Sequence, residues 1–493
     1  MSRHHTNFNC GQFGPVPTTR REWLSRCWGG VGSLALASMM PELGQAADPA
    51  SVDPLAPKAP HFPAKAKSCI FMYMAGGVSQ MDTFDHKPLL QQRAGERMHP
   101  VPGVSGQIEA LLKAPNEILP SPFEFAPYGQ SGRYINSSFK HLGPLVDDLA
   151  FLYGVKVDSN SHGASVMHIN TGSVFQGNPS VGAWVAYGLG TENQNLPGYI
   201  VMHDRRGGPM NGAAVWQSGY LPATYQGTAL RNTGSPILDL ESAPGLNRQH
   251  VRRELDLVRW LNERHAAEEQ TADDLEARIQ SYELAFRMQM EAPDLMSVAN
   301  EPESIRRMYG LDNPVTEPFG TQCLLARRLI ESGVRFVLLV HGYENGVESW
   351  DQHNQLGEFL SSRISEVDQP VAALLKDLKQ RGMFDETLVG WTSEMGRTPT
   401  AQGRGERVRL GRNHNQYGLV SWLAGGGIKG GSSAGETDEF GLRGINDSLR
   451  VRDFHATTLH ALGLNDSALT YLHQGRFKRL TDTGGMVVKD ILA

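Results

Sequence analysis

Six apolar runs of strand length recur along the chain and predict the strands of one sheet. They lie at Ser68–Met74, 149–153, 198–202, 334–340, 387–391 and 418–423. Nearly every position in these runs is apolar, as expected of strands that are buried on both faces. Helical patterns separate several of them. Because strands that alternate with helices form parallel sheets, the pattern indicates an α/β fold with a mostly parallel sheet flanked by helices.

Helices are predicted between and after these strands, at 138–147, 180–188 and 453–463. The most clearly marked helix follows the fourth run. Asp368 is expected to cap it, Pro370 to lie near its first turn and Gly382 to end it. Leucines and valines at helical spacing between these positions predict a face that packs on the sheet.

Two stretches do not follow this alternation. Residues 203–250 form a long polar segment rich in glycine and proline, which is expected to be a lid or substrate wall, or else a loose surface excursion. Residues of about 249–295 are charged and helical, with apolar positions on one face, and are interpreted as a helical insertion that serves packing.

The first 47 residues resemble a twin-arginine export signal. Arg20 and Arg21 precede a short, weakly apolar, glycine-rich run, and Ala46 and Ala47 suit a signal peptidase. The run is shorter than the ~20 residues of a stable membrane span. The alternative is an amphipathic first helix. Residues 48–66 are a Pro/Ala-rich leader, and 67–493 form the domain, which is expected to be periplasmic or extracellular.

Composition and charge give no indication of a nucleic-acid-binding, membrane-binding or disulfide-rich protein. The 493 residues are 40% hydrophobic, which is ordinary for a soluble protein with a large core. A formal net charge of -6 gives no reason to expect nucleic acid or an anionic membrane as partner. The four cysteines are too scattered for a zinc ribbon or a disulfide scaffold, and a single Cys69–Cys323 bridge stays open.

Polar side chains gather where the predicted strands end. In chain order they are Ser79 and Asp82, Ser161 and His162, Asp351 and His353, and Glu394 and Arg397, with His414 just beyond. Because the carboxyl ends of parallel strands lie along one edge of a sheet, these separate weak motifs are expected to form one site.

The residue types at this edge favour metal chemistry. Asp351 and His353, two positions apart on a loop, can point at one divalent ion, with zinc, manganese or iron suited to such ligands. Ser161 and His162 lie in a strand-to-helix turn, where a helix N-terminus can sharpen a nucleophile. Arg397 is a candidate anion clamp. The alternatives are that Ser161 only caps the helix and that Arg397 pairs with a neighbouring acid.

The twin-arginine leader and seven motifs together resemble a bacterial family, the domain-of-unknown-function family fifteen-oh-one, often labelled sulfatase-like. The motifs are Met74-Ala-Gly-Gly-Val-Ser-Gln-Met-Asp-Thr-Phe-Asp85, Trp350-Asp-Gln-His353, Ser393-Glu-Met-Gly-Arg-Thr-Pro399, Gly411-Arg-Asn-His414, Trp422-Leu-Ala-Gly-Gly-Gly427, Gly435-Glu-Thr-Asp-Glu-Phe-Gly441 and Asp453-Phe-His-Ala-Thr-Thr-Leu459. The resemblance implies an alkaline-phosphatase-like fold, whose active members cleave phosphate or sulfate esters with one or two divalent metals.

The resemblance also implies roles for single residues. Asp351 and His353 resemble the Asp-and-His metal pair of that superfamily, His414 its later histidine ligand, and Glu394 the start of an Asp-His pair that Met395 interrupts. Glycines occupy the place of a ligating aspartate after the first strand, so that Asp82 or Asp85 would have to substitute. The Cys/Ser-x-Pro-x-Arg signature of formylglycine sulfatases is absent.

Two hypotheses follow. In the first, the protein is an exported hydrolase of small-molecule or glycan phosphate or sulfate esters, with a catalytic group of Ser161, His162 and Arg397 and a divalent metal of unknown identity. The metal ligands would be Asp82, Asp351, His353, Glu394 and His414. In the second, the fold is kept without turnover and binds sulfated glycans or another exported protein.

Overall fold

The computed structural model describes residues 53–99, 117–230, 256, 257, 260, 295–344, 347–402, 410–446 and 449–493. The expected signal peptide at 1–47 lies outside these residues, as do nearly all of the helical insertion and parts of the leader and of the long loop at 203–250. In the described part of the chain, no helix has the length and apolar character needed to cross a membrane.

One sheet of eight strands forms the centre of the fold, in the order β14-β4-β13-β10-β1-β7-β5-β6. The strands are β1 (Ser68–Met74), β4 (Leu149–Val155), β5 (Tyr199–His203), β6 (Thr228–Leu230), β7 (Phe336–His341), β10 (Thr387–Ser393), β13 (Leu419–Ala424) and β14 (Ser433–Ala434). All six predicted apolar runs are strands of this sheet. Only β13 is antiparallel to its neighbours, so the predicted mostly parallel sheet is confirmed.

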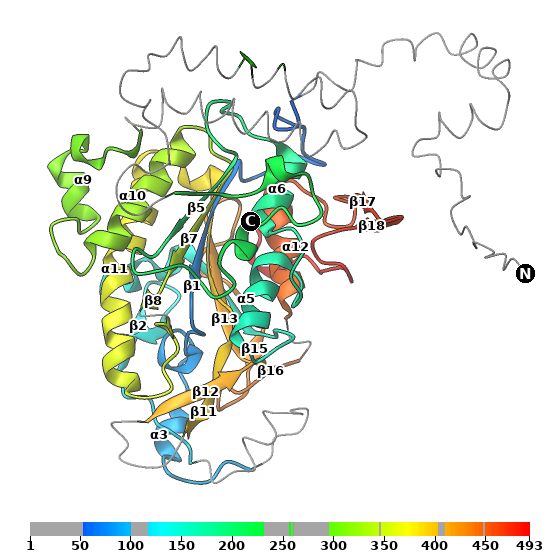
Figure 1. The fold of residues 1–493 in the computed structure, drawn as a ribbon. Coiled ribbons are helices and arrows are strands. Elements are labelled where there is room, and N and C mark those ends of the chain that lie inside the picture. Colours follow the sequence, from blue (N-terminus) through cyan, green and yellow to red (C-terminus); the bar gives the residue numbers. More distant parts are fainter. Residues whose placement is uncertain are drawn as a thin grey trace, which may run out of the picture. The chain divides into compact units, whose positions relative to one another are not determined.

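Helices cover both faces of the sheet (Figure 1). The α-helices in the described part of the chain are α3 (Pro88–Gln92), α5 (His162–Thr171), α6 (Val181–Leu189), α9 (Glu303–Met308), α10 (Glu317–Glu331), α11 (Leu356–Gln380) and α12 (Val451–Ala461). Alternate residues of the central strand divide the core: Ile70 and Met72 pack in a cluster with α10 and α11, whereas Phe71 and Tyr73 pack in a cluster with α5, α6 and α12. This alternation is the two-residue period of a strand.

Short elements complete the described chain. The 3-10 helices are η3 (Gln80–Asp82), η4 (Gly143–Asp148), η5 (Gly212–Trp216), η6 (Ala223–Tyr225), η7 (Val298–Asn300), η8 (Phe384–Glu386) and η10 (Lys489–Ile491). Five two-stranded ribbons pair β2 (Phe125–Tyr128) with β3 (Arg133–Asn136), β8 (Tyr343–Glu344) with β9 (Val347–Glu348), β11 (Gly396–Gln402) with β12 (Gly411–Asn415), β15 (Glu436–Thr437) with β16 (Gly444–Ile445), and β17 (Tyr471–His473) with β18 (Arg476–Lys478).

Two helix predictions were wrong in their bounds. The helix expected at 138–147 is only the 3-10 turn η4. The helix expected to start at Asp368 begins at Leu356, so Pro370 lies in its interior. Asp368 is no cap, because its carboxylate accepts hydrogen bonds from the backbone N–H groups of His141 and Leu142 at 2.9 and 2.8 Å. Apolar packing of the first turns outweighs the backbone hydrogen bond that a proline removes.

The two described cysteines lie on opposite faces of the sheet. Cys69 belongs to the cluster beneath α5, α6 and α12, and Cys323 to the cluster beneath α10 and α11. Both are buried and free, so the Cys69–Cys323 bridge left open by the sequence is not formed.

Candidate metal centre

Three strand ends and one ribbon place their side chains at the same edge of the sheet. His162 begins α5 after β4, Asp351 and His353 follow β7, Glu394 follows β10, and His414 lies on β12. The register of β1 with β7 and β10 aligns these ends, because Met74 pairs with His341 on one side and Ser393 on the other. Residues far apart in the sequence are thereby brought together.

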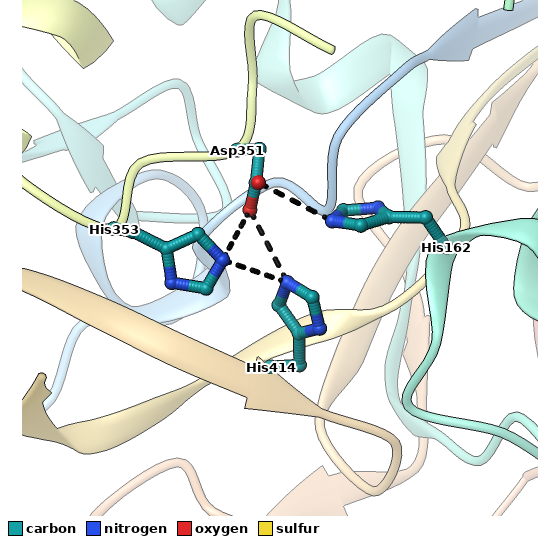
Figure 2. Close-up of side chains that lie close together, drawn as sticks. All are labelled: His162, Asp351, His353 and His414. Atoms are coloured by element: carbon teal, nitrogen blue, oxygen red, sulfur yellow. Dashed lines mark hydrogen bonds and ion pairs between the residues drawn. The ribbon is translucent and has the colours of Figure 1, made fainter. Parts of the chain in front are cut away.

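The first group consists of His162, Asp351, His353 and His414, whose possible ligand atoms all lie within 4.8 Å of one another. Figure 2 shows the three imidazoles around the carboxylate. Asp351 Oδ1 lies 2.9 Å from His353 Nε2 and 3.2 Å from His414 Nε2, and Asp351 Oδ2 lies 3.3 Å from His162 Nε2. The Nε2 atoms of His353 and His414 are 2.9 Å apart.

In each of these histidines the other ring nitrogen contacts an oxygen outside the group. His353 Nδ1 contacts Oε1 of Gln402, and His414 Nδ1 lies 2.8 Å from the carbonyl oxygen of Asn160. His162 Nδ1 lies 2.8 Å from Oε1 of Glu394. A neutral imidazole that donates its Nδ1 proton outward turns a lone pair inward at Nε2, which is the arrangement of metal-bound histidines.

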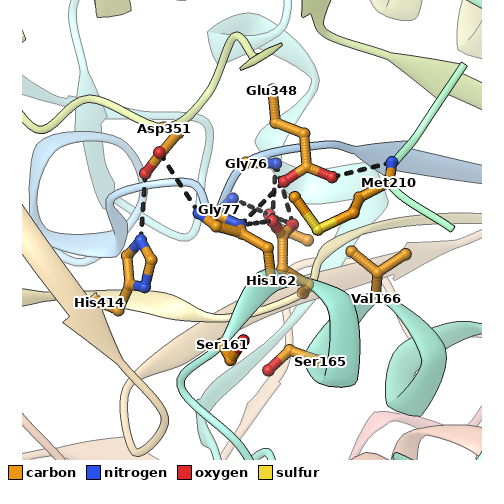
Figure 3. Close-up of polar contacts among 12 residues, drawn as sticks. Gly76, Gly77, Ser161, His162, Ser165, Val166, Met210, Glu348, Asp351 and His414 are labelled. Carbon is orange, nitrogen blue, oxygen red and sulfur yellow. Dashed lines mark hydrogen bonds and ion pairs between the residues drawn. The ribbon is translucent and has the colours of Figure 1, made fainter. Parts of the chain in front are cut away.

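A second group shares His162 and adds two glutamates. His162 Nδ1 lies 2.9 Å from Glu348 Oε2 and 2.8 Å from Glu394 Oε1. Figure 3 shows Glu348 and His162 in this part of the site. Both carboxylates are buried. Glu394 also accepts hydrogen bonds from the Gly76 N–H at 2.8 Å and the Tyr73 hydroxyl at 3.0 Å, so its position is fixed.

The pKa values of the site residues reflect the close packing of three carboxylates around the His162 ring. Burial lowers the pKa of His162, but its hydrogen bonds to Asp351, Glu348 and Glu394 outweigh burial and raise it to about 12. Burial raises the pKa of Asp351, yet the three imidazoles hold it well below its usual range. Burial and the nearby Glu394 charge raise the pKa of Glu348. Without a metal, a positive charge on His162 therefore offsets these carboxylates.

Arg397 is committed to the framework of the site. It is 1% exposed, and its guanidinium donates to the carbonyl oxygens of Gly76 and Gly77 and, at 2.5 Å, to Asp351 Oδ1. The structure therefore favours the alternative that Arg397 pairs with a neighbouring acid. Its bonds orient Asp351, and its guanidinium does not face an open substrate site.

Asp82 and Ser161 lie outside both groups. The Asp82 carboxylate is fully buried and binds the Arg412 guanidinium, with Nε–Oδ2 at 2.6 Å and Nη2–Oδ1 at 3.1 Å. Ser161 occupies the N-cap position of α5, but its side chain makes no capping hydrogen bond and is exposed, so the alternative that it caps the helix through its side chain is wrong. Both residues border the site without joining the candidate ligands.

Sequence reasoning missed Glu348 as a site residue and gave His162 no ligand role. Glu348 lies in the predicted loop between His341 and His353, which is dense in acids and histidines. That density was the available signal, but it did not single out Glu348. The Nδ1 and Nε2 atoms of His162 face different groups, which only the position of the ring in space reveals.

Comparison with solved structures finds distant likenesses. The alkaline phosphatase from the Antarctic bacterium TAB5 is 9% identical, with 82% of this chain and 99% of that chain covered and a TM-score of 0.34. The PsFucS1 sulfatase from Pseudoalteromonas sp. is 11% identical, with 87% and 72% covered and a TM-score of 0.37. A search of curated proteins found no match.

Comparison with protein families gives a match over nearly all of the predicted domain. Residues 66–492 match the family described as "Protein of unknown function (DUF1501)". The match includes every residue of both candidate ligand groups. The chain therefore belongs to the DUF1501 family, as the sequence motifs predicted.

Proposed function

We propose that this protein is an exported, metal-dependent hydrolase of phosphate or sulfate esters. The observation that carries the proposal is the convergence of three imidazole Nε2 atoms on the Asp351 carboxylate, with each Nδ1 directed at an oxygen outside the group. With Nδ1 protonated, all the inward atoms are electron-pair donors. Such atoms repel one another unless a proton or a cation lies among them.

This donor set fits a divalent transition metal. Imidazole nitrogens with one carboxylate suit zinc, manganese or iron, whereas calcium prefers oxygen ligands alone. His162, Asp351, His353 and His414 would hold the ion, with Glu348 and Glu394 beside His162. When bound, the metal would polarise an ester oxygen and lower the pKa of a water nucleophile.

The protein's own groups prepare the site for that chemistry. Arg397 and the histidines fix Asp351, and Gly76 and Tyr73 fix Glu394. Glu348 and Glu394 both face one imidazole nitrogen, so they can hold or accept a proton at His162 Nδ1. The nucleophile is proposed to be a water or the exposed Ser161 hydroxyl. Export by the twin-arginine route is supported by the paired arginines at the N-terminus.

A non-catalytic binding protein is the second candidate. One observation favours it: Arg397, the expected clamp for substrate charge, is buried and occupied by backbone carbonyls and Asp351. An ester anion would have to be held by other groups. A protein that only binds a glycan needs no such clamp at the metal centre.

The experiment is elemental analysis of the purified mature protein together with a panel of phosphate and sulfate esters. Hydrolase function predicts about one or more equivalents of transition metal, with turnover that stops on chelation and returns when the metal is restored. Metal-free protein that leaves all esters intact would exclude the hydrolase and leave the binding function.

Asp351→Asn tests the ligand assignment. The amide keeps the shape but loses the charge, so bound metal and turnover should fall by at least about tenfold. The matched control is Asp148→Asn, because Asp148 pairs with Lys379 at the amino end of β4, opposite the end that His162 follows, and metal content should not change. Metal retention in Asp351→Asn would remove Asp351 from the ligand set.

A further inference from the structure

An open groove lies beside β3 and β4, outside both ligand groups. Its volume is about 610 Å³, and the side chains that line it include Phe84, His86, Ser131, Arg133, Tyr134 and Tyr153. This volume is in the range of small-molecule sites. Phe84 belongs to the core, whereas the exposed side chains of the groove belong neither to the core nor to the candidate metal centre.

A stack of three rings forms one side of the groove. His86 lies between Phe125, with centroids 4.5 Å apart at 15°, and Tyr134, with centroids 5.4 Å apart at 23°. Tyr134 remains 49% exposed. An exposed aromatic ring held flat by a stack beneath it presents a rigid amphipathic platform, suited to a ligand with one apolar face and a polar rim.

Arg133 forms part of the other side and carries a charge without an acid partner. Its guanidinium donates to the Tyr153 hydroxyl at 2.9 Å and to the carbonyl oxygen of Gly431 at 3.4 Å, and both acceptors are neutral. Its Nε is buried and has no hydrogen-bond partner. Among the described residues no carboxylate forms an ion pair with Arg133. Asp147 interacts with it only electrostatically, because the Asp147 carboxylate accepts hydrogen bonds from the backbone N–H groups of Gln130 and Ser131.

The acid in the groove is already neutralised. Asp85 pairs with Lys87 at 3.0 Å and accepts a hydrogen bond from the Thr437 hydroxyl at 2.5 Å. It therefore does not compensate Arg133. The groove thus joins a flat ring, hydroxyl groups and a guanidinium that forms no ion pair with the described residues, a group suited to bind sulfate, phosphate or carboxylate.

We propose that this groove binds carbohydrate that carries an anionic substituent. A pyranose ring has an apolar face that can stack on Tyr134, and its hydroxyls can bond to Ser131 and Tyr153. The anionic group would face Arg133. A purely aromatic ligand fits less well, because the side opposite the ring stack is polar.

The groove also has a direct chain connection to the metal centre. One short stretch runs from Gly76, which binds Glu394, through Asp82, which binds Arg412, to His86 in the ring stack. The groove would then hold the glycan part of an ester substrate, and this role rests on the proposed hydrolase function. Carbohydrate binding itself does not depend on turnover.

The test is calorimetric titration with three matched oligosaccharides and one ion. The probes are dextran sulfate oligosaccharides, oligogalacturonates, uncharged dextran oligosaccharides of the same length, and inorganic sulfate. At least one anionic oligosaccharide should bind about tenfold more tightly than the uncharged one, and sulfate alone should bind more weakly than the sulfated chain. The first two probes distinguish a sulfate from a carboxylate as the preferred group.

Variants locate the binding. Tyr134→Ala should weaken binding at least about tenfold, whereas Tyr134→Phe, which keeps the ring, should stay within about threefold of the wild type. Tyr134 is half-exposed, so neither change should unfold the protein. Phe477→Ala is the control, because Phe477 is 74% exposed on a ribbon that does not line the groove.

The outcomes separate this proposal from the hydrolase. Titrations are repeated on chelator-treated protein and on Asp351→Asn, where groove binding should persist. The groove proposal is overturned if neither anionic oligosaccharide binds, or if Tyr134→Ala binds with the affinity of the wild type. The third outcome is that the wild type binds an anionic oligosaccharide, Tyr134→Ala does not, and the protein cleaves no ester. This result supports the groove proposal and overturns only the hydrolase proposal.

Discussion

Gly76 determines how closely the loop that carries Asp351 can approach β1. A Cβ at this position would lie 2.5 Å from the backbone nitrogen of Asp351 and 2.7 Å from the carbonyl carbon of Trp350. Its φ of +126° is also unfavourable for any residue with a side chain. The same residue donates its N–H to Glu394. One glycine therefore contacts both ligand groups, which explains why an aspartate is not found there.

Gly76→Ala should displace the Asp351 loop and weaken metal binding by at least about tenfold. Backbone strain and the close contact should also lower the free energy of unfolding by about 2 kcal/mol or more. Metal titration and denaturant unfolding measure the two effects.

Gly132→Ala is the matched control for Gly76→Ala. Gly132 has a positive φ of +61°, but a Cβ there would meet nothing within 4 Å. The Gly132→Ala variant should have a lower free energy of unfolding because of backbone strain, but its metal affinity should not change. Equal metal affinity in the two variants would contradict the role given to the close approach of Gly76 to the Asp351 loop.

At the scale of elements, α12 is joined to α5 by a buried histidine. His455 is fully buried on α12, and its Nε2 donates to the carbonyl oxygen of Ile169 on α5 at 2.8 Å. Burial lowers the pKa of His455 to about 4, and the nearby His168 acts in the same direction. The pair of helices is therefore packed around a neutral imidazole.

His455 should make stability fall as the solution is acidified. The unfolded chain protonates this residue near pH 6.5, whereas the folded protein protonates it only near pH 4. Its contribution to folding is full above pH 6.5 and is lost as pH falls through about 4, by up to about 3 kcal/mol.

Denaturant unfolding between pH 4 and 7 checks this expectation. His455→Gln keeps a hydrogen-bond donor but cannot titrate in this range. Its unfolding free energy should change less with pH than that of the wild type, although it is lower at neutral pH. Parallel pH curves for the two proteins would show that another group causes the acid sensitivity.

At the scale of the whole molecule, the candidate ligands come from segments that are far apart in the sequence. α5, the loop after β7 and the ribbon β11–β12 each contribute to the first group. An ion bound to all of them would stabilise the folded chain only, because the unfolded chain does not bring these residues together.

Metal should therefore raise the melting temperature, and chelation should lower it. A ligand at 100 times its Kd stabilises by about 2.7 kcal/mol, which corresponds to several degrees. Differential scanning fluorimetry of protein with and without zinc or manganese measures the shift. In Asp351→Asn the shift should be much smaller. An equal shift in that variant would place the ion elsewhere.

The sequence by itself determined the strands, the mostly parallel sheet and the edge at which polar residues gather. These follow from local properties, because a buried strand must be apolar over its own length and its end must leave the core. Asp351, His353 and His414 were identified in this way, and the structure places them together. Family membership followed from motifs that are equally local.

Only the tertiary structure decided which side chains meet at that edge. It placed His162 in both ligand groups, brought Glu348 to it, bound Asp82 to Arg412 and committed Arg397 to Asp351. It also extended α11 ahead of Pro370. Such pairings depend on how segments hundreds of residues apart are positioned, and on competition between acids for a few cations. Neither is encoded in the spacing of any one motif.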